Sequence, residues 1–273
     1  MTTLQDLERE GREKLPFVLS SSTHQHQGEL NSLLKRFDLS IRRFSTSTSE
    51  KLTAILYLMI GLHWSQAPRS GGEPYITHPL RVAVRLLDEF HDIESCLIEI
   101  ALLHDALEDQ LGKILGDQDA SDDFADLQRG IDQMKEWLGE DIASGIAFLT
   151  FPYWQKVLST AQMREGSDKD TTLPTGDEYN PPDKGIAAMM TTCPHVALVK
   201  FSDLMDNAFR VSSVAAIPRR LKLSRKYLPV LLSIQKTLPQ FSRLSALPDR
   251  FADNLSACIE EIESFITASS DTV

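Results

Sequence analysis

Apolar residues recur at three- and four-residue spacing along most of this chain, and few segments alternate between apolar and polar side chains. Such spacing places apolar side chains on one face of a helix, whereas strict alternation is typical of a half-buried strand. The periodic segments are residues 51–64, 78–90, 93–109, 124–138, 141–149, 195–211, 219–238 and 247–267. Hydrophobic residues make up 42% of the chain, which is enough to bury a core. The sequence therefore predicts an all-α fold.

Boundary signals support several of these helices. Thr77 is predicted to cap the helix that contains His78, and Gly139 separates two helical segments. Pro194 and Pro218 stand where new helices can begin, because proline is favoured in the first turn of a helix.

The two ends of the chain differ from its middle. Residues 1–49 are interpreted as an N-terminal extension with loop-like stretches at 20–28 and 45–49, so compact order is expected from residue 50 onward. Residues 50–211 contain most of the polar motifs and are predicted to form the functional core. Residues 212–273 contain a Leu-rich pair of helices without obvious chemistry, which we expect to pack on that core.

Two long stretches interrupt the helical pattern. Residues 111–130 are rich in Asp and Gly, and residues 164–185 combine charge, Gly and Pro. Loops of this length inside a compact domain are usually functional lids or disordered segments.

Composition excludes several classes of function. The 28 Lys and Arg residues against 39 acidic residues give a formal net charge of −11. The basic residues form no block, and phosphate backbones are held by clustered cations, so we expect no nucleic-acid partner. The longest strongly apolar stretch, residues 52–62, is well short of the ~20 residues that span a bilayer. Residues 1–14 lack the features of a secretory signal, and three scattered cysteines indicate a reducing compartment, so we expect a cytoplasmic protein with no membrane partner.

A group of polar residues follows the apolar helix at 93–103. His104 and Glu108 are four residues apart, as are Asp105 and Asp109, so on a helix these side chains crowd adjoining faces. Burying three carboxylates beside a histidine is costly unless a divalent metal neutralises the acids and takes the imidazole as a ligand. The alternative is a solvated acidic helix end.

Two further segments add candidate ligands. His78 is placed in the first turn of its helix, where it is either a cap or surface residue or a metal ligand. Asp203 and Asn207 lie one turn apart on an otherwise apolar helix, with Lys200 a turn before Asp203. A carboxylate on such a face needs a partner, which is either Lys200 or a metal.

These segments belong to a longer series of motifs. In order, they are His63-x-x-Gln66, Arg69-x-x-Gly72-Glu73-Pro74-Tyr75-Ile76-x-His78-Pro79, Ala101-Leu102-Leu103-His104-Asp105-x-x-Glu108-Asp109, Gly139-Glu140-Asp141-Ile142 and Val199-Lys200-x-x-Asp203-x-x-x-Asn207. The series resembles the hydrolase domain of the RelA/SpoT homologue family, which belongs to the HD-domain metal-dependent phosphohydrolases. The resemblance covers about residues 50–211.

The resemblance implies an HD-domain helical bundle, here with an additional C-terminal helical pair. It also implies a hydrolase of the stringent response that uses a divalent ion, usually Mn²⁺, to remove the 3′-diphosphate of guanosine tetra- and pentaphosphate. The matching metal ligands are His78, His104, Asp105 and Asp203; the catalytic acid pair is Glu108 and Asp109; the nucleotide-binding residues are Arg69 and Asn207, with Lys184 in the place of a family base. Zn²⁺, Fe²⁺ and Co²⁺ also suit these ligand types.

The chain departs from the family pattern near the nucleotide. One extra residue separates His63 from Arg69, Ser70 stands where many relatives carry a base, and the segment after Asn207 differs from the usual Met-Arg-Thr. The identity of the nucleotide base in the substrate therefore remains open. The alternatives are adenosine alarmones and NADPH, from which the 2′-phosphate would be removed.

Two other classes of function are kept beside this one. A generic HD-domain nucleotidase would release orthophosphate from mononucleotides, and a non-catalytic regulator would bind nucleotide without turnover. The length of chain after Val211 leads us to expect a stand-alone hydrolase without a synthetase or regulatory domain.

Overall fold

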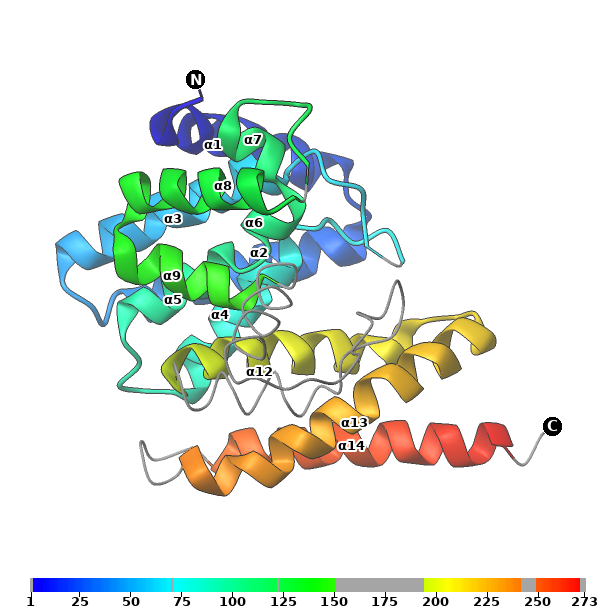
Figure 1. The fold of residues 1–273 in the computed structure, drawn as a ribbon. Helices are drawn as coiled ribbons and strands as arrows, with labels where there is room; N and C mark the ends of the chain where they lie inside the picture. Colours follow the sequence, from blue (N-terminus) through cyan, green and yellow to red (C-terminus); the bar gives the residue numbers. More distant parts are fainter. Residues whose placement is uncertain (1, 70, 122, 151–193, 242–248, 271–273) are drawn as a thin grey trace, which may run out of the picture.

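The computed structural model describes residues 2–69, 71–121, 123–150, 194–241 and 249–270. Every regular element within these ranges is a helix (Figure 1), so the predicted all-α fold is confirmed. The helices are α1 (Leu4–Ser21), α2 (His24–Ile41), α3 (Thr46–His63), α4 (Thr77–Glu89), α5 (Ser95–Leu103), α6 (Ala106–Asp109), α7 (Leu111–Leu115), α8 (Phe124–Leu138), α9 (Glu140–Leu149), α12 (Pro194–Phe209), the 3₁₀ helix η1 (Arg210–Ser213), α13 (Ile217–Phe241) and α14 (Asp249–Ser270). In this part of the chain, none of the helices has both the length and the apolar content needed to cross a membrane.

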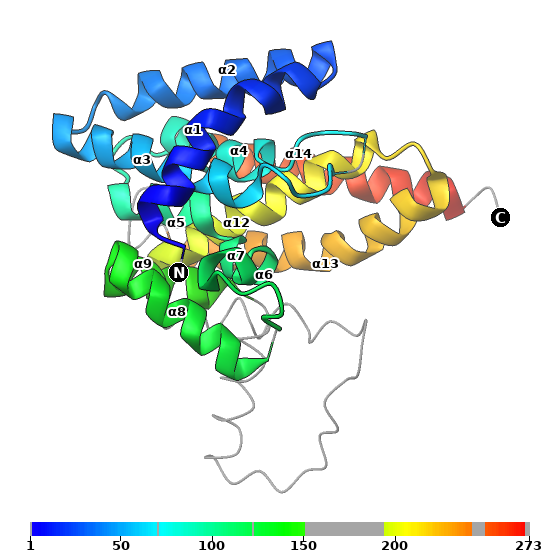
Figure 2. The ribbon, with the colours of Figure 1, turned by 90° about the horizontal axis from the view of Figure 1, so that it is seen from above.

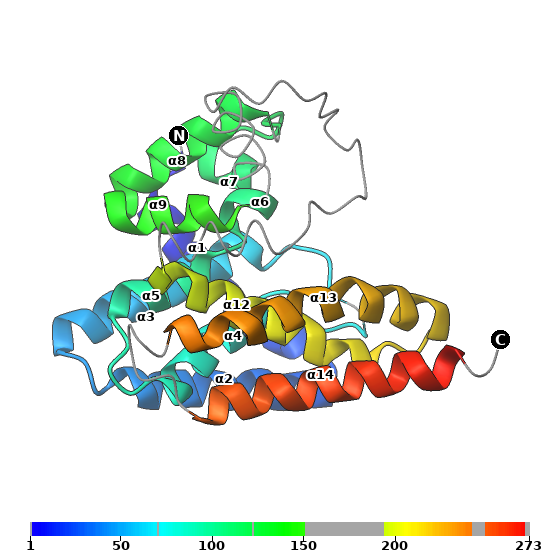
Figure 3. The ribbon, with the colours of Figure 1, turned by 60° about the horizontal axis from the view of Figure 1, so that its bottom comes forward.

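Helix α12 occupies the centre of the arrangement. It contacts α4, α5 and α9 on one side and α13 and α14 on the other (Figure 1). Figure 3 shows the same helices with the predicted C-terminal pair, α13 and α14, in front. Because α12 is packed against helices on both sides, its polar residues Ser202, Asp203 and Asp206 are buried.

The N-terminal segment is part of the packed helical structure, so the expectation that compact order begins at residue 50 is wrong. Helices α1 and α2 bury residues such as Leu7 and Phe37 in the common core. The Ser/Thr-rich stretches that suggested loops supply helix caps instead. Thr23 accepts a hydrogen bond from the His26 amide at the start of α2, and Ser45 accepts one from Thr48 at the start of α3.

Helices α1 and α3 cross at very close range, with α2 beside them (Figure 2). A Cβ atom on Gly11 of α1 would lie 1.9 Å from the carbonyl oxygen of Tyr57, and one on Gly61 of α3 would lie 2.0 Å from that of Leu7. Backbone therefore meets backbone at this crossing, and both glycines are required by the contact rather than by a turn.

Substituting Gly11 tests this contact. Because a methyl group there can be accommodated only if two helix backbones separate, we expect Gly11→Ala to lower the free energy of unfolding by about 2–3 kcal/mol. The control is Gly28→Ala in α2, where a Cβ meets nothing within 4 Å and alanine should instead stabilise the helix by about 0.5–1 kcal/mol. Urea unfolding of both variants gives the comparison, and equal effects at the two positions would contradict the close crossing.

Most of the predicted helix boundaries are confirmed. Gly139 separates α8 from α9 with φ of +93°, a conformation that residues with a side chain rarely adopt. Pro194 is the first residue of α12 and Pro218 the second of α13. The predicted cap at Thr77 is wrong, because α4 begins at Thr77 itself, and Ile76 before it makes no side-chain cap. The Thr77 hydroxyl is buried and has no hydrogen-bond partner among the described residues.

The two predicted loops have different outcomes. The stretch 111–130 is partly helical, because it contains α7 and the start of α8. The stretch 164–185 lies outside the described residues, as does Cys193. Cys96 is half-buried and Cys258 is buried, and both are free thiols.

Candidate metal centre and active site

Four side chains from three parts of the chain meet at one point beside α12. His78 comes from the first turn of α4, His104 and Asp105 from the turn between α5 and α6, and Asp203 from α12. The two Nε2 atoms of His78 and His104 lie 3.3 Å apart. Asp203 Oδ1 lies 3.2 Å from His78 Nε2 and 3.6 Å from His104 Nε2. Asp105 Oδ2 lies 3.6 Å from His78 Nε2, and Asp105 Oδ1 lies 3.2 Å from His104 Nε2. All four residues named by the sequence motifs are thus brought together.

A break in the helix orients one of the imidazoles. Helix α5 ends at Leu103 and α6 begins at Ala106, so His104 and Asp105 occupy a turn rather than a continuous helix. The His104 Nδ1–H group donates to the carbonyl oxygen of Ala101 at 2.8 Å. Since a carbonyl can only accept, this bond places the hydrogen on Nδ1 and directs Nε2 toward His78 and the two carboxylates.

The electrostatics of this group favour a positive charge at its centre. Burial alone would lower the pKa of His104, but the adjacent Asp105 and Asp203 outweigh burial and raise that pKa well above its usual value. Burial alone would raise the pKa of Asp105, but His104 and His78 hold it below its usual range. The histidines and Asp203 are at most 4% exposed, so these charges are poorly screened.

The spacing of the same atoms suits a metal ion. Donor atoms bound about 2.1 Å from one ion lie about 3.0–3.4 Å apart in tetrahedral or octahedral geometry. The distances among the two Nε2 atoms and the nearest carboxylate oxygens run from 3.2 to 3.6 Å. His78, His104 and Asp105 also form a group whose potential ligand atoms all lie within 4.8 Å of one another. The residues present therefore fit a divalent cation.

Asp203 has partners on both of its oxygens. Lys200 Nζ lies 2.9 Å from Oδ2, and Asn207 Nδ2 donates to Oδ1 at 2.7 Å. The sequence offered a salt bridge to Lys200 and a metal as alternatives for this carboxylate. The structure shows that they are compatible, since the ion pair uses Oδ2 while Oδ1 faces the imidazoles.

Asp109 is linked to the candidate metal centre by hydrogen bonds from uncharged side chains. Tyr75 hydroxyl lies within hydrogen-bond distance of Asp105 Oδ2, at 2.6 Å, and of Asp109 Oδ2. It can give its one proton to only one of the two carboxylates at a time. Gln66 also donates to Asp109, at 2.9 Å, and accepts from the buried His63 at 2.6 Å. Burial raises the pKa of Tyr75 and lowers that of His63, so both side chains are neutral donors.

The remaining predicted site residues lie at different places. Glu108 and Asp109 are both exposed on the short helix α6, one turn beyond His104 and Asp105. Lys184 lies outside the described residues.

Arg69 is held beside Asn207 by the loop that carries it. Its backbone N–H donates to the Glu73 carbonyl at 2.8 Å, and Gly71 and Gly72 close the turn with φ of +87° and +82°. The Arg69 side chain donates to Asn207 Oδ1. A cavity of about 170 Å³ opens beside this pair; its lining residues are Arg69, Asn207, Arg210, Val211, Val214, Arg219, Leu223 and Tyr227.

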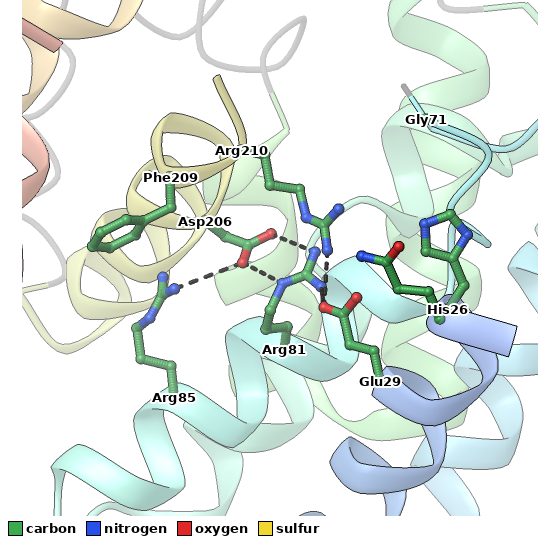
Figure 4. Close-up of a pocket in the computed structure, with 9 residues that line it drawn as sticks. His26, Glu29, Gly71, Arg81, Arg85, Asp206, Phe209 and Arg210 are labelled. Carbon is green, nitrogen blue, oxygen red and sulfur yellow. Dashed lines mark hydrogen bonds and ion pairs between the residues drawn. The ribbon is translucent and has the colours of Figure 1, made fainter. Parts of the chain in front are cut away.

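Asp206 and Arg81 also belong to this site, although the sequence motifs do not single them out. Asp206 is 1% exposed and its Oδ2 accepts a hydrogen bond of 2.8 Å from His78 Nδ1–H. Arg81 in turn contacts Asp206 (Figure 4). The available signal is spacing, since Asp206 lies three residues after Asp203 and Arg81 three after His78, which puts each pair on one helical face.

Comparison with known proteins agrees with the motifs. No family model matches the chain. Over 79 residues it is 32% identical to proteins named GTP pyrophosphokinase rsh from Brucella ovis and Brucella abortus, a match that spans 28% of this chain and only 10% of those relatives. A solved structure described as a metazoan orthologue of SpoT, which hydrolyses ppGpp and has a role in starvation responses, matches 80% of this chain and 97% of its own with a TM-score of 0.51 and 16% identity. The resemblance to the RelA/SpoT homologues is thereby confirmed, together with the helical HD-domain fold.

Proposed function

We propose that this chain, which is similar to the RelA/SpoT homologues, is a metal-dependent hydrolase that removes the 3′-diphosphate of guanosine tetra- and pentaphosphate. The products would be pyrophosphate and GDP or GTP. The observation that carries the proposal is the convergence of His78, His104, Asp105 and Asp203, with donor atoms 3.2 to 3.6 Å apart at a largely buried point. The enzyme would act on the cytoplasmic nucleotide pool during the stringent response, as the resemblance implies.

The metal site follows from the donor set. We assign His78, His104, Asp105 and Asp203 as ligands, and Mn²⁺ as the ion, because mixed imidazole and carboxylate ligation suits Mn²⁺ and the family usually employs it. When bound, the ion would supply Lewis acidity that polarises a phosphoryl oxygen and makes water a better nucleophile near neutral pH.

The reaction uses the acid pair for proton transfer. Glu108 and Asp109 would take a proton from the attacking water, whose oxygen bonds to the phosphorus next to the ribose. The bond between that phosphorus and the 3′-oxygen breaks, and the 3′-oxygen receives a proton as pyrophosphate leaves. Tyr75 and Gln66 hold Asp109 in place for this role through their hydrogen bonds to its Oδ2.

The nucleotide would lie against the cavity beside Asn207. Arg69, Arg219 and Tyr227 line this cavity together with apolar side chains, so it offers cations for phosphate and an aromatic ring for a base or ribose. Arg210 lines it too, but its guanidinium pairs with Glu29 and Glu73. Arg69 has capacity for a new acceptor, because its Nη1 atom makes no hydrogen bond within the described residues and is 3.7 Å from the nearest Asp206 oxygen. An acidic protein can thus receive an anionic substrate at a locally cationic point.

Arg69→Ala tests this assignment. A charge-assisted contact is worth about 1.5–3 kcal/mol, so we expect kcat/KM to fall roughly ten- to a hundredfold while Mn²⁺ affinity is retained. Steady-state kinetics and Mn²⁺ titration provide the two measurements. Arg42→Ala is the control, since Arg42 is exposed at the C-terminal end of α2 and, among the described residues, forms an ion pair only with Asp38. Unchanged kinetics for Arg69→Ala would place the phosphate clamp elsewhere. Lys184→Ala is expected to act chiefly on KM.

Incubation with ppGpp, ppApp and NADPH under Mn²⁺, with products resolved by anion exchange, tests the proposed reaction. Release of pyrophosphate and GDP from ppGpp is the expected result. Preferred turnover of ppApp, or release of orthophosphate from NADPH, would keep the metal site and change the substrate. Orthophosphate released from simple mononucleotides would indicate a generic nucleotidase, and absence of turnover by metal-loaded protein would indicate a regulator.

A further inference from the structure

We propose that Asp206 is a positioning residue that fixes the orientation and the tautomer of His78, and that Arg81 holds Asp206 in place for this purpose. The inference rests on the proposed function, because it treats His78 as a metal ligand. It concerns a residue that neither contacts the ion in the proposal nor appears among the motif residues.

The first step is the contact between Asp206 and His78. Asp206 Oδ2 lies 2.8 Å from His78 Nδ1, and both residues are at most 2% exposed. An ionised carboxylate can only accept, so Nδ1 carries the hydrogen and Nε2 is left to bind a cation. A metal-binding histidine commonly donates its second N–H to such an outer carboxylate, which fixes the ring and raises its basicity.

The second step is the pair of hydrogen bonds that Arg81 donates to Asp206. Arg81 Nε donates to Oδ1 at 2.5 Å and Nη2 donates to Oδ2 at 3.1 Å, so the guanidinium engages both oxygens side-on. Figure 4 shows Arg81 between Asp206 of α12 and Glu29 of α2. Arg85 lies further away, with Nη2 3.7 Å from Oδ1.

The third step is the anchoring of Arg81 itself. Its Nη1 donates to Glu73 Oε1 at 2.8 Å and also contacts Glu29. Glu73 is fully buried and lies in the same loop segment as Tyr75, which bonds to Asp105 on the other side of the candidate metal centre. A continuous series of contacts therefore runs from Glu73 through Arg81 and Asp206 to His78.

The geometry makes a specific forecast for Asp206→Asn. Both carboxylate oxygens accept from Arg81, and Oδ2 also accepts from His78. Asparagine has one acceptor oxygen, and Arg81 can only donate, so the amide oxygen is expected to turn toward Arg81 and the NH₂ group toward His78. An NH₂ group can pair with Nδ1 only when Nδ1 lacks its hydrogen, which forces the hydrogen onto Nε2, the nitrogen needed for the metal.

The experiment compares full-length wild type, Asp206→Asn and Asp206→Ala by titration with Mn²⁺, following free Mn²⁺ by electron paramagnetic resonance. We expect the Mn²⁺ dissociation constant to rise about 10- to 100-fold in both variants, the range typical of a lost outer carboxylate. Glu99→Gln is the matched control. It removes another buried carboxylate, on α5, whose partner is Lys51 at 2.8 Å, and it should leave Mn²⁺ affinity unchanged.

A second measurement separates positioning from a merely structural ion pair with Arg81. In the Zn²⁺-saturated protein, ¹H–¹⁵N spectra of the imidazoles should show slowly exchanging Nδ1 protons on both His78 and His104. The His78 signal should be lost in Asp206→Asn and Asp206→Ala, while the His104 signal, which depends on the Ala101 carbonyl, should persist as an internal reference.

The outcomes are distinct. Wild-type Mn²⁺ affinity in both variants, or a persisting His78 Nδ1 proton in Asp206→Ala, would overturn the role of Asp206 and leave the proposed function intact. A wild-type protein that binds no Mn²⁺ would overturn the proposed function and this inference with it. If Asp206→Ala fails to fold, the nearly isosteric Asp206→Asn decides the question alone.

Discussion

Replacing either His104 or Asp203 by alanine is expected to abolish turnover and bound Mn²⁺ together. Each residue supplies one of the few candidate ligand atoms that meet at the buried point, and Asp203 Oδ1 faces both imidazoles. Loss of a metal that contributes several kcal/mol of transition-state stabilisation lowers the rate by about 10³-fold or more. Wild-type enzyme in excess chelator should show the same loss, and added Mn²⁺ should restore it. Metal content by mass spectrometry and initial rates provide the measurements.

Controls for these variants exist on the surface of the same structure. His195 is exposed at the start of α12, and Asp253 is exposed on α14. His195→Ala and Asp253→Ala remove the same kinds of side chain without touching the candidate metal centre, so both should retain activity and Mn²⁺. Full activity of the wild-type enzyme in excess chelator would contradict the metal-dependent mechanism.

Most of the helices could be predicted because the residues that specify a helix lie within the helix or next to its ends. Apolar spacing and single residues such as Gly139 and Pro194 mark segments that the structure confirms. The N-terminal helices were missed for a physical reason, since Thr23 and Ser45 are favoured both in turns and as helix caps. The contact that fixes α1, between Gly11 and Tyr57, joins residues far apart in the sequence and leaves no periodic signal.

The residues of the candidate site were likewise only partly predictable from the sequence. The residues of the proposed ligand set can be recognised in the sequence because a histidine or an aspartate on an apolar helix needs a partner. Their convergence could be anticipated only through the family resemblance. Asp206 could not be distinguished from an ordinary buried ion-pair residue, because the role proposed for it depends on its contacts with Arg81 and His78, which lie more than 120 residues away in the sequence. Outer contacts of this kind become visible only once helices α4 and α12 are placed side by side.

Substitutions in the proposed acid pair, Glu108 and Asp109, give the second large expected effect, and they distinguish proton transfer from metal binding. Glu108 and Asp109 are exposed and follow His104 and Asp105 by four residues. In the proposed mechanism they act on the attacking water and are not metal ligands. Glu108→Gln and Asp109→Asn should therefore keep near-normal Mn²⁺ affinity while turnover falls by ~10²–10⁴, the range for a lost general base. Rapid-quench turnover and Mn²⁺ titration of each variant check the two parts.

The two variants also test the order of importance within the pair. Asp109 is held by Gln66 and by Tyr75, whose hydroxyl also reaches Asp105, so its position is fixed relative to the candidate metal centre. Asparagine preserves the shape of that arrangement and removes only the basic oxygen, so any large loss is chemical rather than structural. Glu136→Gln and Asp132→Asn on α8 remove exposed acids elsewhere and should have no effect. If Asp109→Asn or Glu108→Gln loses the ion, that residue is a ligand, and the proton must be taken by another group within reach of the attacking water.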